Sequence, residues 1–358
     1  MKLLVVTTPL GPIGSGRGGG VEITLVGLVA GLLGRGHGVT VLAATGSQLP
    51  ASCAAAHIWT CDGRPQISAQ HQDRQALITL AADGLLPRFW RRVLAMGPAS
   101  GFDAVINLAY DWLPLWLTPT APLPIFHLVS MGSVGDAMDQ AIAELAVWDQ
   151  RRLAFHTAVQ AADFELPHPP VVVGNGFDLD AYTFRADPEP LLGWVGRIAP
   201  EKGLEDAAAA AARLGWPLAV WGLQEDPAYA AAVQASVPDG TLQWRGFMPT
   251  AALQLELGHC TVLLNTPKWN EAYGNVVVEA MACGVPVVAY RRGGPGELVQ
   301  TGLNGVLVEP DDVIALAAAV TRAASLDRWA CRRWVEDHAS REVLARRIEA
   351  WLLAGLGR

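Results

Sequence analysis

The chain has 358 residues, a length that predicts two domains. A hydrophobic share of 51% with only 17% charged residues excludes a disordered chain and suits large buried cores. The net charge of −8 argues against nucleic acid as the main partner. The five cysteines are odd in number and form no C-x-x-C pair, which indicates a reducing, cytoplasmic setting with neither a zinc site nor a disulfide framework.

The N-terminal residues Met1–Pro9 become polar too soon for a signal peptide and predict a buried strand. No apolar stretch reaches membrane-spanning length, so we expect no transmembrane segment. The basic run Arg88–Arg92 could touch a membrane surface, but a solvated helix face is the simpler interpretation.

Short apolar runs alternate with helical stretches along the whole chain, a pattern typical of parallel sheets in α/β proteins. Two series of such runs predict two doubly wound domains, joined near Tyr182–Pro190, so that residues 1–185 form the first and residues 186–340 the second. The predicted strands include Leu3–Val6, Val39–Ala43, Ala104–Ile106, Ile125–Val129, Val171–Val173, Leu191–Val195, Leu218–Trp221, Val262–Leu264 and Val285–Ala289. The predicted helices include Val21–Leu33 and Leu204–Leu214.

A glycine-rich loop, Gly11–Gly20, follows the first predicted strand. Its residues Gly14, Gly16 and Gly19 match the G-x-G-x-x-G fingerprint of dinucleotide binding. However, the second strand ends in Ala43–Ser47 without the acidic residue that would hold a ribose. An NAD(P)-dependent oxidoreductase is therefore the weaker alternative. The loop can still bring its backbone close to phosphates before a helix N-terminus, or it can be a plain flexible loop.

Two cations, Arg197 and Lys202, lie between a predicted strand and the helix Leu204–Leu214. The chain has only three lysines among its 26 basic residues, so a lysine here is not the default cation. A planar guanidinium and a compact ammonium both suit a diphosphate, although two ordinary surface cations are the alternative.

Two glutamates, Glu271 and Glu279, flank the start of an almost wholly apolar segment, Asn275–Ala282. As a helix this segment would be buried on nearly every side, and Gly284 would end it. A carboxylate inside it is costly to desolvate unless it has a partner. A hydroxyl-rich ligand, a sugar or a ribose, is one candidate partner.

These motifs together resemble glycosyltransferase family 4, whose members are retaining enzymes of the GT-B architecture. The matching segments are Arg197 with Lys202, Glu271 with Glu279 after seven residues, Gly174–Asp178 and Gly293–Glu297. The resemblance implies two Rossmann-like domains that face each other across a cleft. It also implies that a C-terminal helix, residues 341–358, returns to complete the N-terminal domain.

The resemblance further implies roles for individual residues. Arg197 and Lys202 would clamp the donor diphosphate, Glu271 would hold the transferred sugar, and Glu279 would bind the ribose. His127 matches a family histidine that faces the donor sugar. The remaining donor-binding residues would be Gly18, Gly19, Phe247, Met248, Ala272, Tyr273, Gly274 and Asn275.

The acceptor is expected to bind in the N-terminal domain. Trp112 and Trp116 could stack on a flat ring and Asp111 could accept from ring amines, although core packing of the two tryptophans is the alternative. Thr8–Gly16, Gly18–Glu22 and Ser130–Ser133 resemble a cyanobacterial subgroup that transfers glucose from UDP-glucose to tetrahydrobiopterin. A lipid-linked or phosphorylated sugar is the alternative acceptor.

Neither a cofactor nor a metal is expected beside the nucleotide-sugar substrate. Asp178–Asp180 spells D-x-D, but it lies in a segment that the family uses structurally. One departure concerns Pro267–Asn270, because the family often has a small polar run before its first glutamate.

Overall fold

The computed structural model describes residues 1–15 and 18–358 and divides into two compact units. Unit 1 comprises Met1–Asp178 with Ser340–Arg358, and unit 2 comprises Leu179–Ala339. Gly16 of the glycine motif lies outside the described residues. Unit 2 begins before the predicted boundary at residue 186, because Arg332 donates to the carbonyl of Tyr182 at 2.9 Å.

Unit 1 is built on a six-stranded parallel sheet in the order β3-β2-β1-β4-β5-β6. The central strands have continuous apolar sequences because both faces of the sheet are covered. The strands are β1 Lys2–Val6, β2 Gly38–Ala44, β3 His57–Cys61, β4 Ala104–Asn107, β5 Ile125–Val129 and β6 Leu153–Phe155.

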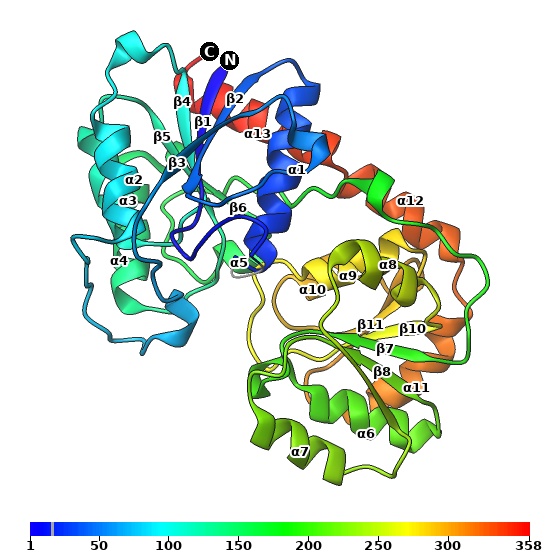
Figure 1. Cartoon of the computed structure of the whole chain (residues 1–358). Helices are drawn as coiled ribbons and strands as arrows, with labels where there is room; N and C mark the ends of the chain where they lie inside the picture. Colours follow the sequence, from blue (N-terminus) through cyan, green and yellow to red (C-terminus); the bar gives the residue numbers. More distant parts are fainter. Residues whose placement is uncertain (16–17) are drawn as a thin grey trace. The chain divides into compact units, whose positions relative to one another are not determined.

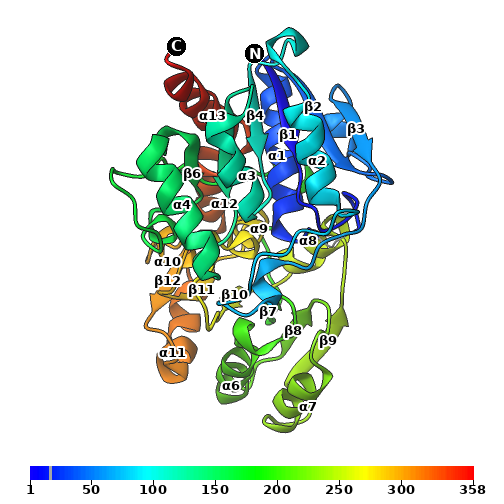
Figure 2. The same ribbon diagram turned by 90° about the vertical axis from the view of Figure 1, so that its left-hand side faces the viewer.

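Helices cover both faces of this sheet (Figure 1). Leu3 and Val5 of β1 pack with α1 and α13, whereas Leu4 and Val6 pack with α2, as the alternation along a strand requires. Figure 2 turns the side of α2 and α3 toward the viewer. The helices are α1 Gly20–Gly34, α2 Leu85–Leu94, α3 Trp112–Leu117, α4 Asp136–Asp149, α5 Ala158–Ala161 and α13 Arg341–Leu356.

The C-terminal helix α13 packs against α1 within unit 1. The five apolar side chains that the sequence assigns to its docking face are all buried. Trp351 meets Phe126 of β5 edge to face at 5.2 Å. A Cβ on Gly31 of α1 would lie 2.4 Å from the carbonyl oxygen of Arg341, so glycine permits the close approach of the two helices. The five side chains are Val343, Leu344, Ile348, Trp351 and Leu352.

Unit 2 repeats the same topology, with the parallel order β12-β11-β10-β7-β8-β9. Its strands are β7 Leu192–Val195, β8 Leu218–Trp221, β9 Leu242–Gly246, β10 Val262–Asn265, β11 Val287–Tyr290 and β12 Gly305–Val308. Its helices are α6 Leu204–Leu214, α7 Pro227–Ala235, α8 Thr250–Gly258, α9 Asn275–Ala282, α10 Pro295–Leu298, α11 Val313–Ala324 and α12 Arg328–His338.

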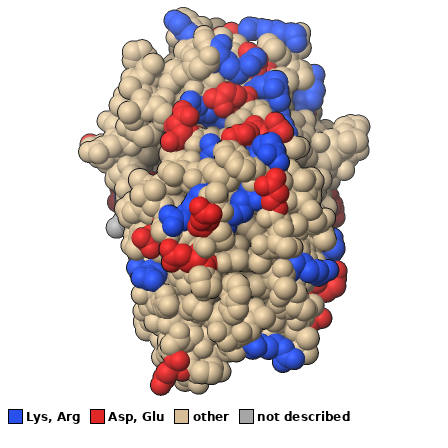
Figure 3. Space-filling model, turned by 90° about the vertical axis from the view of Figure 1, so that its right-hand side faces the viewer, with Lys and Arg blue, Asp and Glu red and all other residues tan. Residues whose placement is uncertain are grey.

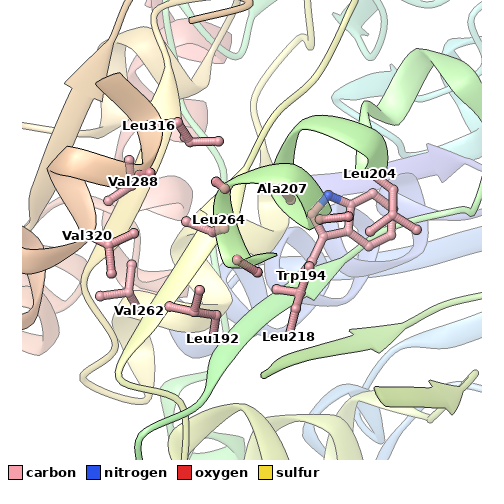
Figure 4. Packing of buried hydrophobic residues seen from close by; sticks show 14 of the residues in the cluster. Leu192, Trp194, Leu204, Ala207, Leu218, Val262, Leu264, Val288, Leu316 and Val320 are labelled. Atoms are coloured by element: carbon pink, nitrogen blue, oxygen red, sulfur yellow. The ribbon is translucent and has the colours of Figure 1, made fainter. Parts of the chain in front are cut away.

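The main core of unit 2 lies between this sheet and the helices α6 and α11 (Figure 4). Trp194 of β7 is almost fully buried in it, beside Leu204 and Ala207 of α6. Its indole N–H donates to the Thr266 hydroxyl at 3.3 Å, and that hydroxyl donates to the Gly203 carbonyl at 2.7 Å. The core thus fixes the two segments that carry Lys202 and Glu271.

The sequence-based strand prediction was wrong for Val171–Val173, where only an isolated bridge between Phe155 and Val172 forms. It also missed β3, β6, β9 and β12. β3 and β9 are edge strands with polar or exposed residues, so they lack the apolar run of a buried strand.

The protein surface carries mixed charges. Figure 3 shows acidic and basic side chains interspersed on one face, with no continuous basic area there. This mixture fits the net charge of −8. Within residues 1–15 and 18–358, every helix is too short or too polar to cross a membrane.

Candidate active site

The candidate site in unit 2 is centred on an ion pair between Lys202 and Glu271. The Lys202 Nζ atom lies 2.5 Å from the Glu271 Oε1 atom. Lys202 ends a short 3₁₀ helix, Pro200–Lys202, just before α6, and Glu271 lies in the loop between β10 and α9. Their side chains are 19% and 11% exposed, so the pair is partly shielded from water yet reachable by a ligand. The structure therefore joins two motifs that lie 69 residues apart.

Arg197, the second predicted cation, lies in the loop after β7. Its guanidinium binds Glu201 at 2.7 Å and also pairs with Glu225. The side chain is 24% exposed. Both cations of the motif therefore have carboxylate partners in the structure, and an incoming anion would have to replace or share them.

Gly294 locks the Glu271 loop in place. Its N–H donates to the Glu271 carbonyl at 2.7 Å, and a Cβ at this position would lie 2.2 Å from the Tyr273 carbonyl oxygen. Only a residue without a side chain allows this approach. The packing of the loop that carries Glu271 therefore requires a glycine at position 294, just before Pro295.

The loop enters α9 through Ala272 and Tyr273. Gly274 is the N-cap of α9 with φ 99°, a conformation that favours glycine, and Asn275 is the first helical residue. The N-terminus of α9 carries a partial positive charge near Glu271. These four residues lie around the start of α9.

Glu279 is buried within α9, with 5% of its surface exposed. Burial raises its pKa to about 7, against a smaller lowering by a hydrogen bond from Tyr182. The Tyr182 hydroxyl donates to the Glu279 Oε1 atom at 3.1 Å. The carboxyl thus has a protein partner that the sequence did not reveal, because Tyr182 lies 97 residues away.

Phe247 and Met248 follow β9 in unit 2. The Phe247 side chain is 58% exposed, which leaves a ring face for a flat ligand, and Met248 is half-buried beside it in the chain. An exposed aromatic ring next to the carboxyl end of a parallel strand is a suitable platform for a nucleobase.

In unit 1, His127 does not have the open setting that the sequence interpretation requires. It lies within β5 with 2% exposure, and burial lowers its pKa to about 3. Its Nδ1 atom lies 3.1 Å from the Asn107 amide and its Nε2 atom lies 2.7 Å from the Thr118 hydroxyl. Both ring nitrogens therefore have protein partners, and this geometry favours a neutral, structural histidine.

The proposed acceptor residues lie at the start of α3. Asp111 is the N-cap of this helix, accepts from the Leu113 N–H at 3.2 Å and also bonds Gln66. Burial raises the pKa of Asp111. Trp112 and Trp116 stack on each other with centroids 5.4 Å apart, and Trp116 is 59% exposed. The geometry leaves one face of Trp116 open, whereas Asp111 already has a capping role.

The glycine loop of unit 1 holds an acidic side chain that sequence reasoning did not single out. The backbone N–H groups of Gly14 and Gly18 donate to the Glu22 carboxylate at 3.0 and 2.9 Å. Gly19 is the N-cap of α1 with φ 53°. Glu22 is the third residue of that helix, where an acidic side chain commonly turns back toward the N-cap. This spacing is the signal that could have identified it.

Within residues 1–15 and 18–358, no group of three or more His, Cys, Asp and Glu side chains has an arrangement that could hold a metal ion. Asp178 of the D-x-D sequence pairs with Arg341 at 2.6 Å. That carboxylate links the end of the first stretch of unit 1 to the start of α13.

The family model for "Glycosyl transferases group 1" matches residues 180–352. Residues 180–352 thus resemble the group 1 glycosyltransferases. All the candidate residues of unit 2 lie within this match, from Arg197 to Glu279. The match thus covers the region in which the structure joins Lys202 to Glu271.

Individual glycosyltransferases of known name are also similar to this chain in sequence. The chain is 28% identical over 259 residues to D-inositol 3-phosphate glycosyltransferase of Mycolicibacterium smegmatis, covering 66% of this chain and 57% of the relative. It is 38% identical over 165 residues to GDP-mannose-dependent alpha-mannosyltransferase of the same species, covering 46% and 41%. The chain thus spans about half the length of these curated relatives.

The fold is that of GT-B glycosyltransferases. The structure of HepE from Anabaena in complex with UDP matches with a TM-score of 0.74 over 99% of this chain and 100% of that one. The sequence identity is 18%, so this likeness concerns the fold alone. The two parallel sheets predicted from the sequence are confirmed, and each has six strands.

Proposed function

We propose that this protein is a retaining, metal-independent glycosyltransferase of the cytoplasm that transfers glucose from UDP-glucose to a small acceptor. The observation that carries the proposal is the Lys202–Glu271 pair at the N-terminus of α9, within the family match. A cation, a carboxylate and a helix N-terminus are the groups that a nucleotide sugar needs. The five cysteines are free, which fits a reducing compartment.

In this proposal the diphosphate binds Arg197, Lys202 and the amides at the start of α9. The two cations would exchange carboxylates for phosphate oxygens. Glu271, released from Lys202, would accept hydrogen bonds from hydroxyls of the sugar. Glu279 would accept from the ribose, and Phe247 with Met248 would contact the base.

The proposed reaction has one bond broken and one formed at the anomeric carbon. The bond from this carbon to the diphosphate oxygen breaks, and a hydroxyl oxygen of the acceptor forms the new bond on the same face. The hydroxyl proton passes to an oxygen of the departing phosphate. Arg197, Lys202 and the positive end of α9 stabilise the negative charge that grows on the diphosphate. Neither glutamate forms a covalent bond.

The donor is assigned from named relatives and from unit 2. HepE is described in complexes with UDP and with UDP-glucose, which supports a uridine donor. A relative named as dependent on GDP-mannose is 38% identical over 165 residues, which makes GDP-mannose the second candidate. The exposed ring of Phe247 would stack on either base.

The acceptor is assigned from unit 1 and is a pterin in our proposal. The open face of Trp116 could stack on a flat bicyclic ring, and a displaced Asp111 could accept from its amine. The relatives named D-inositol 3-phosphate glycosyltransferase favour a phosphorylated acceptor instead, which is the second candidate.

A donor panel tests the reaction class. The protein is incubated with UDP-, GDP- and ADP-sugars, alone and with tetrahydrobiopterin or inositol 3-phosphate, and nucleoside diphosphate release and glycosylated product are measured. We expect release from UDP-glucose that rises with the pterin. Stabilisation by NAD(P) without any response to nucleotide sugars would contradict the proposal.

Substitution of the central lysine tests the site. We expect Lys202→Met to reduce kcat/KM by about 100- to 1,000-fold, because one charge-stabilising group is lost from the transition state. Lys2→Met, which removes an exposed lysine of unit 1, is the matched control and should keep wild-type activity. Full activity of a folded Lys202→Met protein would remove Lys202 from the mechanism.

A further inference from the structure

Trp269 lies beside the Lys202–Glu271 pair and belongs to the segment that departs from the family pattern. The Lys202 Nζ atom lies 4.9 Å from the centroid of the Trp269 ring. The same ammonium lies 2.5 Å from the Glu271 Oε1 atom. The cation thus has a carboxylate and an aromatic face as partners, and a ring within about 6 Å attracts a cation.

The indole N–H of Trp269 is buried and has no hydrogen-bond partner in the described part of the chain. A buried donor without a partner costs free energy. The N–H group therefore does not anchor the ring at this position. The aromatic face toward Lys202 is the part of the side chain that forms an identified polar interaction.

The segment before Trp269 is held from three sides. The Lys268 N–H donates to the Glu201 carbonyl at 2.9 Å, and Arg292 donates to the Pro267 carbonyl at 2.9 Å. The Lys268 ammonium pairs with Asp311 at 2.9 Å and with Asp206. A segment fixed in this way keeps the ring in place when the partners of Lys202 change.

We propose that Trp269 is a positioning residue that keeps the Lys202 ammonium at the donor site while Glu271 is exchanged for the diphosphate. The inference rests on the proposed function. A lysine side chain has four rotatable carbon bonds, so it loses its orientation when its carboxylate partner leaves. The ring is neutral, so it restrains the ammonium without competing for the space or the charge of the phosphate.

A double-mutant cycle tests this role. Trp269→Phe, Trp269→Leu, Lys202→Met and the double variants are compared for UDP binding by calorimetry and for kcat/KM with the donor. We expect Trp269→Phe to stay within about twofold of wild type, because a ring face remains, and Trp269→Leu to lose about three- to tenfold in both quantities. In the Lys202→Met background, Trp269→Leu should cause no further loss.

Two outcomes would overturn the role of Trp269. One is an equal loss from Trp269→Leu with and without Lys202, which would mark a purely structural residue. The other is a loss in Trp269→Phe as large as in Trp269→Leu. If the leucine variant does not fold, Trp269→Met retains more volume without a ring and takes its place. Trp329→Leu, at a half-exposed site on α12, is the matched control.

The same experiment separates this inference from the proposed function. A wild-type protein that neither binds nucleoside diphosphates nor turns over any nucleotide sugar would sink the proposed function itself. If the wild-type protein binds UDP and turns over the donor, but the effects of Trp269→Leu and Lys202→Met simply add, the proposed function stands. Only the positioning role of Trp269 is then refuted.

Discussion

The two sheets have the same strand order, yet the polar groups on and after their strands differ in kind. In unit 1, the loop after β1 uses two backbone amides to hold Glu22, and His127 of β5 is neutral and bonded to its neighbours. In unit 2, the loops after β7 and β10 carry a cation and a carboxylate, Lys202 and Glu271, that bond each other. The same fold therefore positions different chemistry, which is set by the side chains of the loops.

Two buried ionisable groups, His127 in unit 1 and Glu279 in unit 2, are of opposite type. Burial lowers the pKa of His127 in unit 1 and raises the pKa of Glu279 in unit 2, so both groups favour their neutral forms. The pH dependence of stability that follows has opposite sign in the two cases. The unfolding free energies of His127 and Glu279 variants, measured over a range of pH, can therefore test the two predictions independently.

The largest expected effect concerns His127. Its pKa is about 3 in the folded protein and 6.5 as the ordinary value, so the unfolded state takes up more protons between these limits. The stability that the neutral His127 side chain contributes is thus fully present above pH 6.5, and it is lost as the pH falls from 6.5 toward 3. We expect a loss of about 3 kcal/mol between pH 7 and pH 4 that is absent in His127→Gln.

Urea unfolding at a series of pH values measures this difference. His57→Gln, at an exposed histidine of β3, is the control and should follow the wild-type profile. A His127→Gln protein with the wild-type pH profile would mean that the imidazole is open to protonation in the folded state. In that case His127 would regain its place as a candidate ligand-facing residue.

Glu279 should show the opposite trend. Its pKa is about 7 in the folded protein against 4.5 ordinarily, so the unfolded state releases its proton first as the pH rises. Stability contributed by the protonated carboxyl is full below pH 4.5 and is lost through pH 7. We expect the wild-type unfolding free energy to fall by about 2 kcal/mol more than that of Glu279→Gln between pH 5 and pH 7.

The same titration with UDP present connects Glu279 to the donor. A ribose hydroxyl that donates to the ionised carboxylate would stabilise the charged form and shift the transition to lower pH. Glu256→Gln, at an exposed position of α8, is the matched control. A transition that UDP leaves unchanged would speak against Glu279 as the ribose partner, because the Glu279 carboxyl would then keep its hydrogen bond from Tyr182 and gain none from the ribose.

The sequence predicted the α/β class, the parallel sheets and the bounds of α9, for physical reasons. Central strands are continuous apolar runs, and α9 has the predicted bounds because Gly274 and Gly284 limit it. Exact partners were not predictable. Tyr182 and Glu279 are 97 residues apart, and Lys202 and Glu271 are 69 apart, so only folding identifies which side chains meet. The burial of His127 was not predictable either, because a family motif does not reveal local burial.

The smallest expected effect concerns Glu22, whose carboxylate accepts from the amides of Gly14 and Gly18 in the first turn of α1. A negative charge at a helix N-terminus is stabilising, and charge-assisted bonds are stronger than neutral ones. We expect Glu22→Gln to lower the unfolding free energy by about 1 kcal/mol at low salt and by less at high salt. Glu342→Gln, in the first turn of α13 and 68% exposed, is the control with a smaller expected loss. An unchanged unfolding free energy in Glu22→Gln would mean that the glycine loop after β1 does not need the negative charge of Glu22. The comparison of the two units would then depend only on the Lys202–Glu271 pair of unit 2.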